Sequence, residues 1–229
     1  MLKSFTSRFF VFAFFCFTFS GCASWKNSPQ QVAKDLTSEA AITVERFRKH
    51  EKLKEFEKFL EQAYAVIIFP NVVKAGLFYG GEAGNGVLLM RDPKGGWSDP
   101  TYVSIGAASF GLQVGIQETA IVLILRNEGA LRSVLNHQGK LGADTGATIG
   151  LWGVGMEASV TSNLDVDILA FANANVGAYI GISLEGAVIA KRSDLNEAIY
   201  GKGATPEKIL SGNYKSNQID RLRKILGEY

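Results

Sequence analysis

The sequence predicts an α+β fold, in which a mainly antiparallel, glycine-rich, curled or barrel-like sheet lies between helices at the N- and C-terminal ends. Residues 28–63 carry apolar side chains at helical spacing, residues 65–187 consist of short apolar runs punctuated by glycine, and residues 193–226 return to helical spacing. The runs in the middle follow one another too closely for helical crossovers. Neighbouring strands are therefore expected to be antiparallel.

Two helices are expected before the sheet. Ser28 as the N-cap, Pro29 at the first helical position and Gln31 as the partner in a capping box predict a helix start. The helical spacing then goes out of phase, so two helices should meet near residues 48–52. Their many Lys and Glu side chains are typical of a solvated face. The alternative is a helix at a membrane surface, which mixed charges favour less.

The middle of the chain predicts a series of short strands. The first, Val66–Phe69, is expected to stop at Pro70, which has no N–H to donate to a sheet. Residues Glu82–Asn85 are typical of a hairpin turn. A meander of this many strands has to curl, and a barrel-like closure is one way to do so. The other expected strands are Gly76–Gly81, Gly86–Met90, Thr101–Ile105, Gly111–Ile116, Thr119–Leu125, Ala147–Leu151, Gly153–Val160, Leu164–Phe171 and Ala178–Ala187.

Four more helices complete the expected order. One lies within the strand-rich middle and three follow it, and each has a recognisable start or stop signal. The whole length of 229 residues suits one domain of ordinary size. The expected helices are Ala130–Gln138, Asp194–Tyr200 with Ser193 as its cap, one opened by Thr205 and Pro206, and a last one starting at Ser216.

The charge balance argues against a protein that binds polyelectrolytes. Lys plus Arg total 24 and Asp plus Glu total 22, a formal net charge of +2. Lys3 and Arg8 supply this excess, because residues 1–21 contain no acidic side chain. The remaining chain is formally neutral, so we expect no nucleic-acid partner, although a local basic patch stays open.

The N-terminus has the order of features found in secretory signals. Lys3 and Arg8 precede the apolar stretch Phe9–Phe19, and two small residues then precede Cys22. The stretch is too short for a transmembrane helix, which needs ~20 residues. The run Phe19–Cys22 resembles a bacterial lipobox, whose Cys receives a diacylglyceryl group and becomes the new N-terminus. The alternative is a plain secretory signal, or a short anchor, that happens to contain Cys22.

Cysteine usage agrees with this interpretation. Cys16 would be lost with the signal and Cys22 would be acylated, which leaves no thiol for a disulfide, a metal site or a nucleophile. Ala23 follows the Cys, and by resemblance to Gram-negative lipoproteins this indicates the outer membrane, with the protein facing the periplasm. The expected organisation is a lipoprotein signal peptide at 1–21, an acylated tether at 22–27 and a single domain at 28–229.

Six segments of the middle recur in the order typical of one family. They are Ala65–Gly76, Gly80–Leu89, Gly96–Pro100, Gly111–Gln117, Leu141–Asp144 and Gly181–Gly186. Together they resemble the SYLF domain, a family of lipid-binding modules of fungi, animals, plants and bacteria. The resemblance covers residues 30 to about 212 and points to the bacterial SYLF-domain lipoproteins.

This resemblance implies binding of phosphoinositides or other acidic lipids. In yeast and animal members it also implies actin binding, which is not carried over here, because a periplasmic protein does not meet its own host cell's actin. Residues 173–180 also lack the Ser/Arg-rich character usual at this place in the family. We expect a membrane-anchored lipoprotein that binds acidic lipids. The alternative is a structural or scaffold lipoprotein of the envelope that holds a protein partner.

Four residues are candidates for lipid contact. Lys74 lies in the family-like segment, and Arg91 and Lys94 precede Trp97 in the loop after the expected hairpin. A Trp beside cations suits a membrane interface, where the ring lies at head-group depth and the cations meet phosphate. The alternative is a Trp that packs over the end of a hairpin, with solvated charges around it.

Signals for catalysis and cofactors are weak. His50 and His137 have no neighbour at i+3 or i+4 that would complete a metal site. The glycine-rich run Gly80–Gly86 is not followed by the Lys-Ser/Thr of a phosphate loop. We therefore expect a binding protein that is not an enzyme and has no metal or cofactor.

Overall fold

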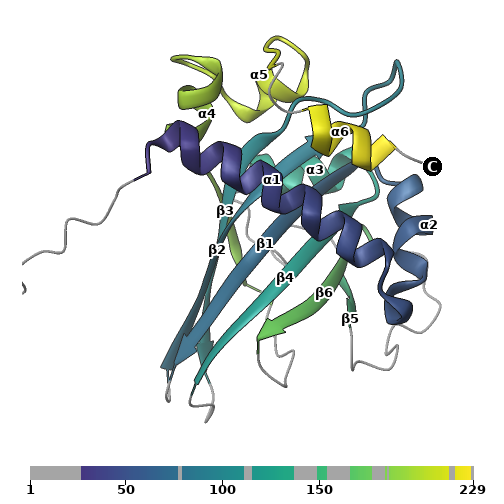
Figure 1. Ribbon diagram of the computed structural model, residues 1–229, viewed down its shortest axis with the longest axis vertical. Helices are drawn as coiled ribbons and strands as arrows, with labels where there is room; N and C mark the ends of the chain where they lie inside the picture. Colours follow the sequence, from purple (N-terminus) through teal and green to yellow (C-terminus); the bar gives the residue numbers. More distant parts are fainter. Residues whose placement is uncertain are drawn as a thin grey trace, which may run out of the picture.

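A twisted sheet of mostly antiparallel strands forms the middle of the computed structural model, and helices pack against it (Figure 1). The structure describes residues 27–76, 79–110, 115–136, 149–153, 166–176, 184, 186–216 and 220–227. Its elements are α1 (Pro29–Arg48), the 3₁₀ helix η1 (Glu51–Leu53), α2 (Glu55–Glu61), β1 (Ala65–Gly76), β2 (Tyr79–Met90), β3 (Thr101–Phe110), β4 (Gly115–Leu125), α3 (Glu128–Asn136), β5 (Ile149–Gly153), β6 (Ile168–Val176), β7 (Val188–Lys191), α4 (Ser193–Tyr200), α5 (Pro206–Leu210) and α6 (Asp220–Gly227).

The strand order confirms the predicted α+β fold with a mainly antiparallel sheet. The order is β5-β6-β4-β1-β2-β3-β7, and only β5 and β6 are parallel. β5 and β7 are the outer strands, so the sheet is open over the described residues. The predicted strands Gly111–Ile116, Gly153–Val160 and Ala178–Ala187 lie largely outside those residues.

The first helix begins where the sequence predicts. Ser28 Oγ accepts the Gln31 N–H at 3.2 Å, and Pro29 occupies the first turn. The Gln31 side chain does not follow the predicted capping box, because its amide nitrogen donates forward to Asp35 at 2.7 Å. The chain then turns through η1 into α2, which confirms two helices meeting near residues 48–52.

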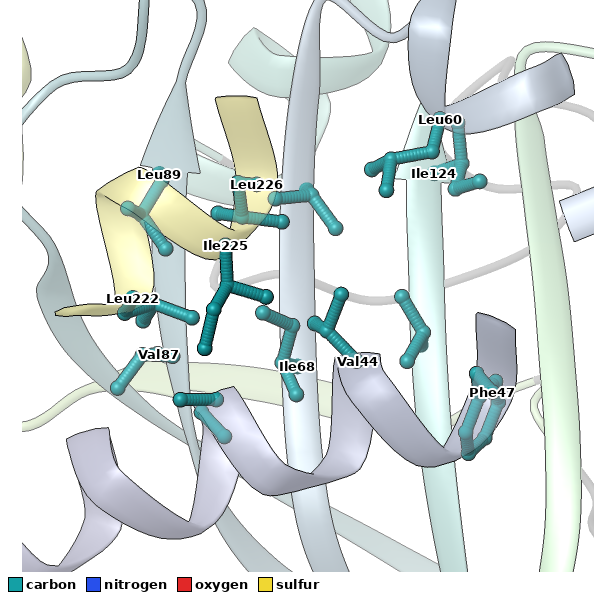
Figure 2. Close-up of a cluster of buried hydrophobic side chains, with 14 of the residues drawn as sticks. Val44, Phe47, Leu60, Ile68, Val87, Leu89, Ile124, Leu222, Ile225 and Leu226 are labelled. Atoms are coloured by element: carbon teal, nitrogen blue, oxygen red, sulfur yellow. The ribbon is translucent and has the colours of Figure 1, made fainter. Parts of the chain in front are cut away.

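Helices α1 and α6 cover the upper half of one face of the sheet (Figure 1), and Figure 2 shows buried side chains at this contact. Val44 and Phe47 of α1 belong to the same buried cluster as Ile68 of β1 and Ile124 of β4. The last helix packs into this cluster too. Its buried side chains are Leu222, Ile225 and Leu226.

The opposite face of the sheet has its own core. Ile67 of β1 and Leu123 of β4 lie there with Leu131 and Val134 of α3. β1 and β4 are therefore buried on both faces over this part of their length, which explains their nearly continuous apolar sequence.

The start of α5 is as predicted, and the N-cap of α4 differs from the prediction by one residue. Thr205 Oγ1 accepts the Lys208 N–H at 3.5 Å and Pro206 begins α5, as predicted. The predicted cap of α4 is wrong by one residue: Ser193 is already helical and Arg192 holds the N-cap position. The Arg192 guanidinium instead binds Asp194 through two hydrogen bonds of 2.7 and 2.8 Å.

The expected strand end at Pro70 is wrong. β1 runs through this position to Gly76, and its register shifts between Ile68 and Asn71 against β2 and between Phe69 and Val72 against β4. A β-bulge places two residues opposite one, so a residue without an N–H can be accommodated there. The proline therefore marks a bulge within a continuous strand.

The expected turn at Glu82–Asn85 is also wrong, because these residues lie inside β2. The connection between β1 and β2 falls at residues 77–78, and Gly76 pairs with Gly80 beside it. The glycines of β2 serve a different purpose. A Cβ at Gly86 would lie 2.5 Å from the Phe69 ring and 2.6 Å from the Ile68 carbonyl oxygen.

Gly86→Ala should destabilise the fold. The added methyl group has to displace both a buried ring and a backbone oxygen, so the free energy of unfolding should fall by about 2–3 kcal/mol. Urea unfolding followed by circular dichroism measures the change. Gly81→Ala is the matched control, because the nearest atom to a Cβ there is 3.9 Å away. Equal stability of the two variants would contradict this account of Gly86.

Candidate functional site

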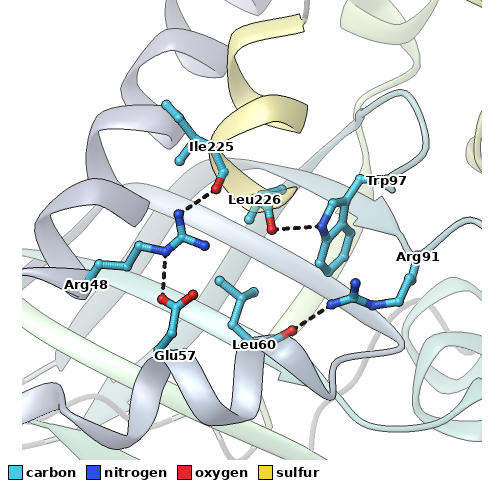
Figure 3. Close-up of polar contacts among 7 residues, drawn as sticks. All are labelled: Arg48, Glu57, Leu60, Arg91, Trp97, Ile225 and Leu226. Atoms are coloured by element: carbon cyan, nitrogen blue, oxygen red, sulfur yellow. Dashed lines mark hydrogen bonds and ion pairs between the residues drawn. The ribbon is translucent and has the colours of Figure 1, made fainter. Parts of the chain in front are cut away.

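Arg91 closes the end of helix α2 (Figure 3). It follows β2, and its Nε donates to the Ala63 carbonyl at 3.0 Å. Its Nη2 donates to the carbonyls of Leu60 and Glu61 at 2.9 and 3.1 Å. The last carbonyls of a helix have no partner within the helix, and a cation there also offsets the negative end of the helix dipole.

Trp97 caps the C-terminal end of helix α6 in the same way. This residue is only 6% exposed, and its Nε1–H donates to the Leu226 carbonyl at 3.1 Å (Figure 3). The Arg91 guanidinium carbon lies 4.5 Å from the centre of the ring, within the range of a cation–π contact. The two residues thus join the ends of α2 and α6 at one place.

Arg48 completes this junction from α1. Its Nη1 donates to the Ile225 carbonyl at 2.5 Å, and its Nε binds Glu57 Oε2 of α2 at 2.7 Å (Figure 3). Sequence analysis did not identify Arg48, since its local sequence looks like any charged helix end. Its carbonyl partner, Ile225, belongs to α6, which is distant in the sequence and packs beside α1 only in the folded chain.

Lys74 lies at the other end of the β1–β2 hairpin from Arg91. It pairs across the strands with Glu82, with 2.9 Å between Nζ and Oε1. The Glu82 side chain is only 5% exposed and the Lys74 side chain 23% exposed. A carboxylate that is this well buried needs a cationic partner, so the pair has a structural use.

The four predicted lipid-contact residues therefore do not form one group. Trp97 is covered by protein, Arg91 is engaged with carbonyls, and Lys74 is distant from both in the register of β1 and β2. Lys94 is exposed in the loop after β2, where its N–H binds the Asp92 carboxylate at 2.8 Å. Lipid contact by these residues stays a prediction, and Lys94 is the most accessible of them.

A buried polar cluster fastens α4 to β3. Asn196 Oδ1 accepts from the Thr101 hydroxyl and the Tyr102 N–H, both at 2.9 Å, and its Nδ2 donates to the Tyr102 carbonyl. The Tyr102 hydroxyl lies 3.0 Å from Thr37 Oγ1 of α1. Burial raises the pKa of Tyr102 to about 12, so its phenol stays neutral at ordinary pH. Sequence analysis did not identify this asparagine either.

A second buried contact holds α6 against the start of β3. Asp99 lies 3.3 Å from the Arg223 guanidinium and accepts the Ser216 N–H at 3.4 Å. Nearby, the Tyr200 hydroxyl donates to the Pro100 carbonyl at 2.7 Å, and burial raises the pKa of Tyr200 as well. These groups bind one another, so their chemistry is that of a structural network.

The described residues offer little for metal chemistry or membrane crossing. They contain no group of three or more His, Cys, Asp or Glu side chains that could hold a metal ion. None of the helices in this part of the chain combines the length and the apolarity that spanning a bilayer requires. Cys22 and His137 lie outside the described residues.

Comparison with known proteins identifies one family. The family model "Ysc84: Las17-binding protein actin regulator" matches residues 106–229. Protein YSC84 of Saccharomyces cerevisiae is 34% identical over 158 residues, 68% of this chain and 34% of that protein. SH3 domain-containing YSC84-like protein 1 of Xenopus laevis is 30% identical over 162 residues, 69% of this chain and 48% of that protein. The chain thus spans about a third of the yeast relative and about half of the frog one.

Replacing Arg91 should cost stability, because the carbonyls at the end of α2 would lose a charged donor. We expect Arg91→Met, which keeps most of the side-chain volume, to lower the free energy of unfolding by about 2 kcal/mol. Chemical denaturation measures the change. Lys94→Met is the control and should stay within about 0.5 kcal/mol of the unaltered chain. If the two variants lost the same stability, the capping role of Arg91 would be refuted.

Proposed function

The chain belongs to the Ysc84 family, whose members carry the SYLF domain, and we propose that it is a membrane-anchored lipoprotein whose domain binds acidic lipids and catalyses no reaction. The names of its relatives describe binding and regulation: "Las17-binding protein actin regulator" for the family and "LAS seventeen-binding protein 3" for a second yeast protein, 32% identical over 158 residues. None of these names describes a reaction.

The order of residues at the N-terminus carries the anchoring part of this proposal. A basic segment, an apolar stretch, two small residues and Cys22 follow one another immediately ahead of α1. On this proposal residues 1–21 are removed, Cys22 receives the acyl chains and residues 22–27 tether the domain that starts at 28. Since each buried methylene contributes about 0.8 kcal/mol, more than one acyl chain gives lasting attachment. Ala23 after the Cys favours the outer membrane, with the domain in the periplasm.

Palmitate labelling tests the anchor directly. In a bacterial host that processes lipoproteins, the unaltered chain should incorporate radioactive palmitate, and Cys22→Ser should abolish incorporation, because the acceptor thiol is gone. Cys16→Ser is the matched control and should label normally, since that residue leaves with the signal. Unchanged labelling of Cys22→Ser would overturn the lipoprotein proposal.

The acidic-lipid part of the proposal relies on family membership and on exposed cations. Lys94 is exposed in the loop after β2, where its backbone N–H binds Asp92. Its side chain can therefore bind a phosphate head group without disturbing the fold. Arg91 and Lys74 supply positive charge near the surface while serving the α2 terminus and Glu82. Head-group recognition therefore rests first on Lys94.

Flotation tests this part with a chain that starts at Ser24 and so has no anchor. It should float with vesicles containing a phosphoinositide or phosphatidylglycerol, float poorly with phosphatidylcholine, and lose binding at high salt. Lys94→Gln should weaken binding about fivefold, because one cation near an acidic surface contributes about 1 kcal/mol. Lys58→Gln on α2 also removes an exposed positive charge and is the control. No flotation on any vesicle would overturn intrinsic lipid binding.

A protein partner is the second candidate function. The family description, Las17-binding protein, names a protein as the bound partner and favours this alternative. Actin is not carried over, because a periplasmic domain is separated from it. Cross-linking in intact envelopes distinguishes the two candidates: one stoichiometric protein partner, together with no vesicle preference, would favour a scaffold lipoprotein.

A further inference from the structure

The sheet continues beyond its helical cover. In Figure 1 the ends of β1, β2 and β4 extend below α1. Two cross-strand rows of residues lie on these ends, on the same face of the sheet that α1 covers further along the strands. The first row is Ala108, Gly81, Ala75 and Ile116. The second row is Gly106, Ala83, Val73 and Glu118. We call the six exposed residues of these rows the sheet-end face: Val73, Ala75, Gly81, Ala83, Ala108 and Ile116.

The sheet-end face is apolar and open to solvent. Ile116 is 68% exposed and Val73 37% exposed, and both are among the few large apolar side chains exposed in the described part of the chain. The other four members are glycine or alanine, which present a flat surface. The charged side chain that shares these rows, Glu118, is half-buried.

The alternation of β1 separates this face from a polar one. Val73 and Ala75 point to the sheet-end face, and Lys74 between them points to the opposite face, where it binds Glu82. One end of the sheet thus has an apolar side and a charged side. Such an arrangement suits a boundary between an apolar and an aqueous phase.

From these observations we propose that the sheet-end face is a membrane-contact surface, which lies against the acyl-chain region of the bilayer. The inference rests on the proposed function, because the lipid anchor at Cys22 is what brings the bilayer close. The chain from Cys22 to Pro29 spans about 25 Å when extended, which limits how far the domain can move from the membrane. In Figure 1 the start of α1 lies at the upper left of the domain and the free ends of β1 and β2 at the lower left.

A bilayer fits this surface better than a second copy of the chain. A stable protein interface buries about 800 Å² on each partner and uses about 20 residues or more. The sheet-end face has six residues, and four of them lack side chains large enough to interlock with a partner. A fluid acyl phase needs no matching shape and gains from any apolar area removed from water.

The experiment uses the full acylated chain in vesicles, with one new thiol at a time. With Cys16 removed and Cys22 blocked, Ile116→Cys provides a single site for an environment-sensitive dye, and Val73→Cys provides a second. Ser211→Cys, at the exposed end of α5, is the control. The vesicles contain phosphatidylethanolamine and phosphatidylglycerol, with lipids that carry a quencher on the acyl chain.

The expected result is that the dyes at positions 73 and 116 shift to shorter wavelength and lose emission to the quencher, also at high salt, while the dye at 211 does neither. If the protein floats but position 116 is no more quenched than 211, the inference is overturned and the anchor stands. If the full chain neither floats nor incorporates palmitate, the proposed function fails and the inference with it. In detergent, the dye at position 116 could instead be shielded while the protein has twice the mass of one chain. That result would overturn the inference in favour of a second copy.

Discussion

The first half of β1 is buried on both of its faces, and the rest of the fold depends on this constraint. Residues 65–69 all have 0% exposure. Since burying one large apolar side chain fully contributes about 1.5–3 kcal/mol, neither face of this strand can be left to water. One face is covered by α1 and α6, and the other by α3 and the residues before β7. Elements from both ends of the chain therefore have to meet over the same strand.

Bringing helices together over one strand also brings their ends together. The carbonyls at the ends of α2 and α6 lie beside the core, where water cannot satisfy them, so side chains have to. Arg91, Trp97 and Arg48 do this from three different elements. In the sequence, Trp97 beside Arg91 and Lys94 resembles a membrane-contact site. In the fold, Trp97 and Arg91 instead connect the ends of α6 and α2.

The bulge at Pro70 marks where the double burial of β1 ends. Before it the strand is a core element, and beyond it the same strand carries Val73 and Ala75 on an open face. The molecule thus combines a well-packed body with an exposed, apolar sheet end. The yeast relative is about three times as long as the matched segment, so its name describes a protein with further sequence of its own.

Local interactions let the sequence determine the starts of α1 and α5 and the strand-rich middle by itself. The caps at Ser28 and Thr205 connect residues three apart, and the alternation of helical and glycine-punctuated segments gives the α+β class. Tertiary structure alone decided what the glycines of β2, Pro70 and Trp97 do. Gly86 is small because Phe69 on the next strand needs its space, not because the chain turns there. A cross-strand neighbour of this kind is distant in the chain, so no local pattern can reveal it.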